Sequence, residues 1–97
     1  MAKFYFTNKA VSDLADIWDY TSETWSEKQA ENYYMLLIGS CKELARKPNI
    51  GRKYSQISSD IYGFVAYQHL IFYRILSKKE IEIVRILHGR MDLNNKI

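Results

Sequence analysis

The stretch from Ile61 to Leu87 constrains the fold of this chain more than any other feature. Almost every residue from Ile61 to Leu76 is apolar or aromatic, and residues 80–87 are again rich in Ile, Val and Leu. Apolar runs rich in Ile and Val, bounded by turn residues, are typical of strands buried in a sheet. A break near residues 67–69 and a turn at residues 77–79 divide the stretch into predicted strands over 61–67, 69–76 and 80–87.

The N-terminal half has a different periodicity. Residues 3–7 alternate and are rich in aromatic side chains, which predicts a short strand. Apolar residues then recur at helical spacing from Val11 to Trp25 and again from Ala30 to Ala45. The acidic residues of the first helix fall mostly on its other face. The pattern predicts two amphipathic helices that form an antiparallel hairpin.

The ends of these helices also have sequence signals. Thr7 or Asn8 can cap the first helix, and Ser26, with Gln29 at the capping-box position, can cap the second. Pro48 ends the second helix, and residues 49–53 are predicted to be a loop. We expect Gly39, inside the second helix, to permit close approach of the first.

These elements predict an α+β fold in a single domain over residues 1–97. In this arrangement the N-terminal strand joins a three-stranded antiparallel meander. The helical hairpin packs on one face of that sheet, because each helix has only one apolar side.

Composition and charge narrow the function classes. The chain has no stretch of membrane-spanning length, its N-terminus lacks the apolar segment of a signal peptide, and the single Cys41 cannot form an internal disulfide. These features favour a cytoplasmic protein. Residues 1–48 carry six basic and seven acidic residues, whereas residues 49–97 carry eight and four. The basic half is expected to attract an acidic partner, either nucleic acid or protein.

The last predicted strand ends in a polar cluster, which is the clearest candidate for a functional site. Arg85 interrupts the apolar run, and His88, Arg90 and Asp92 surround Gly89. A buried cation needs a partner, and Asp92 is the expected partner of Arg85. The alternative reading is a strand end with solvated polar residues.

The chain resembles a ParE-type toxin of the RelE/ParE superfamily of toxin–antitoxin modules. The resemblance is carried by the order and spacing of several segments along the whole chain. They are Phe4-Tyr5-Phe6, Asp13-Leu14-Ala15-Asp16-Ile17-Trp18-Asp19-Tyr20-Thr21, Trp25-Ser26-Glu27 with Gln29-Ala30, His69-Leu70-Ile71-Phe72-Tyr73-Arg74, Ile81-Glu82-Ile83-Val84-Arg85-Ile86-Leu87-His88 and Arg90-Met91-Asp92.

The resemblance implies a toxin that inhibits DNA gyrase by protein contact and is neutralised by a ParD-like antitoxin. DNA would be contacted only through the antitoxin or gyrase. The alternative is a RelE-like, ribosome-dependent messenger RNA endoribonuclease. RelE-like enzymes carry Lys and Arg on the central strands and a Tyr near the C-terminus. The corresponding positions here hold Ile61, Gly63 and Leu70, and no Tyr follows Asp92. The binding function is therefore favoured over catalysis.

Site residues follow from the same comparison. No catalytic set, cofactor or metal site is expected. The expected target-binding residues are Arg74, Arg85, His88, Arg90, Met91 and Asp92, and the expected antitoxin-binding residues are Trp18, Tyr33 and Tyr34. One departure from the family pattern is Tyr62, since many ParE-type sequences have Arg before the Gly-Phe pair of this strand. Whether toxicity is retained depends on this position if that Arg contributes to it.

Overall fold

The computed structural model describes residues 1–89. Its elements follow one another along the chain as strand, two helices and a run of strands. They are β1 (Lys3–Phe6), α1 (Asn8–Thr24), α2 (Glu27–Arg46), the 3-10 turn η1 (Pro48–Ile50), β2 (Arg52–Lys53), β3 (Tyr62–Ala66), β4 (His69–Ser77) and β5 (Glu80–His88).

The strands form one sheet in the order β1-β5-β4-β3-β2. The pairs β5–β4, β4–β3 and β3–β2 are antiparallel, whereas β1 runs parallel to β5, with Phe6 opposite Ile83. The long connection through both helices makes this parallel pairing possible. β5 carries a bulge at Val84, because Ile83 pairs with Tyr73 while Arg85 pairs with Phe72.

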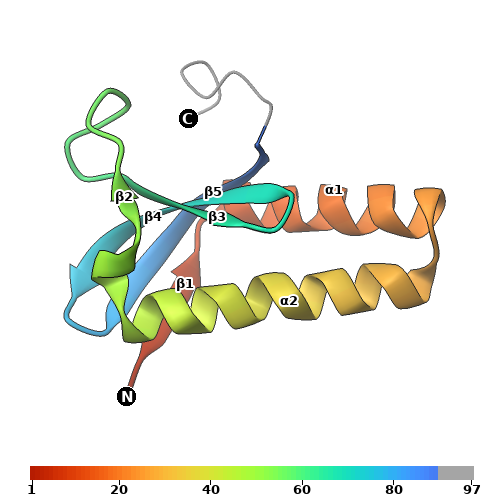
Figure 1. The fold of residues 1–97 in the computed structure, drawn as a ribbon, viewed down its shortest axis with the longest axis horizontal. Helices are drawn as coiled ribbons and strands as arrows, with labels where there is room; N and C mark the ends of the chain where they lie inside the picture. The colour runs from red at the N-terminus through yellow and green to blue at the C-terminus, as the bar shows by residue number, and fades with distance from the viewer. Residues whose placement is uncertain (90–97) are drawn as a thin grey trace.

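The two helices lie on one face of the sheet and run antiparallel (Figure 1). Their apolar sides meet the inner sides of β4 and β5 in the main core, around Leu37, Leu44, Ile71, Tyr73 and Ile83. The end of the hairpin where α1 passes into α2 extends beyond the strands (Figure 1). Apolar side chains at that end therefore have no sheet to pack against.

The opposite face of the sheet has a second, smaller core. Ile61, Leu70 and Phe72 are buried there together with Val84 and Leu87, and Tyr54 and Ile57 from the loop after β2 pack over them. The Tyr54 ring meets Phe72 edge-on at 5.3 Å between centroids. A Cβ at Gly63 would lie 2.6 Å from Tyr54 Cε1, so only glycine lets the Tyr54 ring approach so closely.

Tyr73 fixes the chain that leaves α2. Its hydroxyl donates to Pro48 O at 2.6 Å and accepts from Gly51 N at 3.1 Å. Burial raises the pKa of Tyr73 to about 12, so it remains a neutral donor. These bonds hold η1 against β4.

The predicted fold class is confirmed, including the helical hairpin on one sheet face and the antiparallel meander. The strand boundaries agree to within one or two residues. Thr7 caps α1 by accepting from Ala10 N, and Ser26 caps α2 by accepting from Gln29 N. No helix within residues 1–89 is long and apolar enough to cross a bilayer.

Three smaller predictions were wrong. Residues 49–53 are not simply a loop, because η1 and β2 lie there and β2 adds a fifth strand. Gly39 does not mediate close helix approach, since a Cβ there would meet nothing within 4 Å. Asp13 is not on the solvent face of α1: its exposure is 8%, the lowest of any charged residue among those described.

Candidate functional site: a groove between the helical hairpin and the strand ends

A groove of about 860 Å³ lies between the helical hairpin and the ends of β4 and β5. We call it the hairpin groove. Its walls come from α1, the start of α2 and the last residues of β5 with the start of β4. The lining residues are Asp13, Asp16, Ile17, Tyr20, Thr21, Trp25, Gln29, Tyr33, Gln68, His69, Arg85, Ile86, Leu87 and His88.

The floor of the groove is held by an ion pair between α1 and β5. Arg85 donates from Nε and Nη2 to the two Asp13 carboxylate oxygens, at 2.7 and 2.8 Å. The Ile86 backbone N–H also donates to Asp13, at 3.0 Å. The hydrogen bonds that Arg85 donates to Asp13 raise the pKa of Arg85, and the side chains of Asp13 and Arg85 are only 10% and 17% exposed. The forked geometry is the strong form of this contact.

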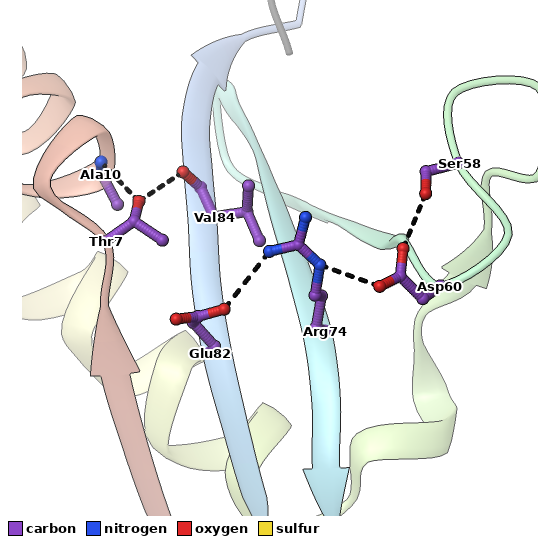
Figure 2. Close-up of polar contacts among 7 residues, drawn as sticks. All are labelled: Thr7, Ala10, Ser58, Asp60, Arg74, Glu82 and Val84. Atoms are coloured by element: carbon purple, nitrogen blue, oxygen red, sulfur yellow. Dashed lines mark hydrogen bonds and ion pairs between the residues drawn. The ribbon is translucent and has the colours of Figure 1, made fainter.

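The Asp13–Arg85 ion pair lies beyond the end of β1. β1 covers the outer edge of β5 only as far as Ile83, and the next outward groups of β5 meet side chains of the α1 segment. Thr7 Oγ1 donates to Val84 O at 2.8 Å, and Asp13 accepts from Ile86 N (Figure 2 shows the Thr7 contacts). α1 is thereby fixed against the edge of the sheet.

A tyrosine–histidine contact forms the wall on the opposite side of the groove. Tyr33 of α2 accepts from Gln68 N at 3.1 Å, and its hydroxyl lies 2.6 Å from His69 Nδ1. Burial, with a smaller contribution from His88, lowers the pKa of His69 to about 4, so the ring is neutral. Burial also raises the pKa of Tyr33. The His88 ring meets His69 edge-on at 5.5 Å.

The turn between β3 and β4 carries a strained residue beside this contact. Tyr67 has φ 61°, the only positive φ among non-glycine residues of the described chain. A bulky side chain in this region costs about 1–3 kcal/mol. The Tyr67 ring packs edge-on against Tyr33 at 6.2 Å, and the Gln68 bond to Tyr33 holds the turn. Strain of this kind is concentrated at functional sites.

The rim of the groove at the hairpin end is aromatic and acidic. Tyr20 and Trp25 are 68% and 73% exposed, and Asp16 is exposed one helical turn before Tyr20. Tyr and Trp are enriched at protein interfaces relative to the rest of a protein surface. The groove therefore has the composition of a docking surface.

The structure brings together two of the predicted target-binding residues and separates a third. Arg85 and His88 line the hairpin groove, whereas Arg74 lies outside it. Arg74 donates to Asp60 at 2.9 Å and to Glu82 at 3.3 Å (Figure 2). Arg90, Met91 and Asp92 lie outside the described residues. Arg85 pairs with Asp13, and its expected pairing with Asp92 lies outside the described residues.

The predicted antitoxin-binding residues fall in two places. Tyr33 lines the hairpin groove. Trp18 and Tyr34 instead meet edge-on at 6.2 Å in a second pocket of about 340 Å³, which Phe6, Val11, Leu14 and Ala15 complete. Trp18 and Tyr34 are 36% and 37% exposed, so neither is a core residue.

Sequence reasoning also missed several groove residues. The periodicity places the acidic residues of the first helix mostly on its polar face, and the contact of Asp13 with Arg85, 72 positions away, has no local signature. The Tyr33–His69 contact joins residues far apart in the chain and has no local signature. Within residues 1–89 no group of three or more His, Cys, Asp or Glu could hold a metal ion.

Comparison with known proteins identifies the family. The family model described as "ParE toxin of type II toxin-antitoxin system, parDE" matches residues 4–93, nearly the whole chain. The chain belongs to the ParE toxin family. The predicted resemblance is therefore confirmed.

Individual ParE relatives support the same assignment. Toxin ParE1 of Mycobacterium tuberculosis is 32% identical over 96 residues, covering 99% of this chain and 98% of the relative. Toxin ParE1 of Caulobacter vibrioides is 28% identical over 92 residues, covering 95% and 94%. A solved structure described as a chromosomal ParDE TA system from P. aeruginosa superposes with a TM-score of 0.76. It covers 91% of this chain and 96% of that one, at 22% identity, and shows the common fold.

Proposed function

We propose that this ParE-family chain inhibits DNA gyrase by protein contact and is neutralised by a ParD-like antitoxin. The observation that carries the proposal is the match to the ParE toxin model along residues 4–93. In this proposal the chain acts in the cytoplasm and contacts DNA only through the antitoxin or gyrase. It needs no cofactor or metal of its own.

The sheet supports binding over RNA cleavage. Cleaving RNA requires a base, cations near the phosphate and an acid for the leaving oxygen. At the strand positions where RelE-like enzymes carry cations, Ile61 is fully buried and Leu70 is 5% exposed, beneath Tyr54 and Ile57. Gly63 lies under the Tyr54 ring. These positions belong to a covered apolar core, which offers no cation to an RNA phosphate.

The proposed gyrase-binding surface is the end of β5 and the residues that follow. His88 lies at this end, and Arg90, Met91 and Asp92 continue the chain. Arg85 is proposed to position the end of β5 and not to contact gyrase itself, because its guanidinium is paired with Asp13 of α1. Arg74 is partly exposed and contributes a further cation, which lies outside the hairpin groove. Tyr62, at the departure from the family pattern, stacks on Tyr73 at 5.8 Å.

The proposed antitoxin site is the hairpin groove and the adjoining Trp18–Tyr34 pocket. Both are lined by partly exposed aromatic residues on the hairpin. A helix with an apolar face is the partner that such a groove accepts. An occupied groove would cover Tyr20 and Trp25 and remove their exposed area from water.

The function is tested by two assays run in parallel with the purified chain. One measures supercoiling and DNA cleavage by gyrase, and the other measures cleavage of a defined message on translating ribosomes. We expect trapped cleaved DNA and lost supercoiling, with the message intact. Cleaved message with unaffected gyrase would establish the RelE-like alternative instead. A folded chain with neither effect would contradict both activities and leave an antitoxin-binding protein.

A further inference from the structure

The charge inside the hairpin groove points to the chemistry of its occupant. The chain as a whole has a net charge of +3, yet residues 10–27 contain five acidic residues and no Lys or Arg. They are Asp13, Asp16, Asp19, Glu23 and Glu27. This segment includes most of α1, which forms one wall of the groove.

Within the groove most charges are already balanced. Asp13 is matched by Arg85 through a pair of hydrogen bonds. His69 is held neutral by its burial. Asp16 remains as an exposed carboxylate that forms no ion pair within residues 1–89. The groove wall therefore presents negative charge to an incoming segment.

The end of α1 adds a second contribution of the same sign. The last turn of a helix exposes carbonyl groups that favour a cation, and the last turn of α1 contains no basic residue. The adjoining start of α2 is already complemented, by the Ser26 cap and by Glu27 in the first turn. A cation from outside the described chain would complement the end of α1.

The side chains beside Asp16 suit a cation with an aliphatic stem. Tyr20 follows Asp16 by one helical turn, and Trp25 lies at the C-terminal cap. Aromatic faces attract Lys and Arg heads, and Trp is the strongest of them. The stems of Lys and Arg can lie on apolar surface such as Ile17, which lines the same groove.

We infer that the segment docking in the hairpin groove inserts a Lys or Arg side chain against Asp16, beside Tyr20 and Trp25. The inference rests on the proposed function, because it takes the docking partner to be the antitoxin. It adds to the expectation that the basic half of the chain attracts an acidic partner. Carboxylates of the partner would pair with basic residues elsewhere, whereas the hairpin groove selects a basic residue.

Two helical peptides of about 18 residues, long enough to form helix, provide the test. They share one Leu pattern and differ only in flanking Lys and Arg or flanking Glu. Fluorescence anisotropy of the labelled peptides against the full chain gives each dissociation constant at about 0.15 M salt, where distant charges are screened. We expect the basic peptide to bind at least about tenfold more tightly, equivalent to about 1.4 kcal/mol.

Variants assign the preference to Asp16. Asp16→Asn should weaken the basic peptide about five- to tenfold, while Asp19→Asn, the same change on α1 outside the groove lining, should change it less than about twofold. Asp16→Lys should reverse the preference. Both positions are exposed, and circular dichroism verifies that each variant is folded.

Each outcome decides the inference separately from the gyrase proposal. Tighter binding of the acidic peptide would leave the groove a docking site and overturn the inferred chemistry. Equal effects of Asp16→Asn and Asp19→Asn, or no binding of either peptide, would also overturn it. The gyrase assay of the unmodified chain involves neither peptide, so its result stands alone.

Discussion

Two arginines on neighbouring strands of the same sheet have opposite environments. Arg85 of β5 is 17% exposed and donates two hydrogen bonds to the Asp13 carboxylate, which also accepts from the Ile86 backbone N–H. Arg74 of β4 is 39% exposed, and its partners Asp60 and Glu82 are 57% and 36% exposed. The same residue type therefore has a structural role in one place and a solvated role in the other. Solvent access, more than the number of ion pairs, separates the two cases.

The largest effect is expected from breaking the buried pair. Asp13→Ala removes an acceptor shared by the largely buried Arg85 guanidinium and the Ile86 N–H, and should lower the free energy of unfolding by about 3–5 kcal/mol. Urea denaturation measures the loss. A loss below about 1 kcal/mol would contradict the structural role of the pair. The double variant Asp13→Ala, Arg85→Met should recover part of the stability, because the cation that Asp13 balances is removed as well.

An intermediate effect is expected from the neutral imidazole in the groove. The pKa of His69 is lowered to about 4 in the folded chain, so between its ordinary value near 6.5 and pH 4 the unfolded chain binds more protons. Stability is therefore full near pH 7 and falls as the pH is lowered. After allowance for solvent screening, the loss between pH 7 and pH 5 should be about 1 kcal/mol.

Thermal unfolding at several pH values measures this dependence. His69→Asn is the control, because its amide can hydrogen-bond to Tyr33 as donor or acceptor and cannot titrate. An unchanged pH profile in that variant would show that His69 is not the responsible group.

The smallest effect is expected at the exposed arginine. Arg74→Met should change the free energy of unfolding by no more than about 0.5–1 kcal/mol, because solvent and salt already weaken both ion pairs. The Ser58 hydrogen bond, with Arg74, lowers the pKa of Asp60, so this contribution is present near neutral pH and is lost as the pH falls below the ordinary Asp range. Denaturation in low and high salt measures it. A large, salt-independent loss would remove the distinction between the two arginines.

The sequence predicted elements well and contacts across elements poorly. Local periodicity and capping residues gave both helices and the meander, because those signals lie within a few residues of each other. The Asp13–Arg85 and Tyr33–His69 contacts join residues 72 and 36 positions apart, so their partners could not be identified from local pattern. The resemblance to the ParE family came from motif order. It did not indicate that Trp18 and Tyr34 line one pocket while Tyr33 lines another.

The closure of the β5 edge by side chains has a consequence for solubility. An edge strand with unsatisfied backbone groups is a template for pairing with other chains, and aggregation often begins there. Thr7 and Asp13 occupy the outward groups of β5 beyond β1, so a foreign strand would first have to displace them. The opposite edge, β2, is only the cationic pair Arg52–Lys53, which repels a second copy of itself. Self-association of the described chain would therefore start from the exposed aromatic residues of the hairpin, the surface that a bound partner would cover.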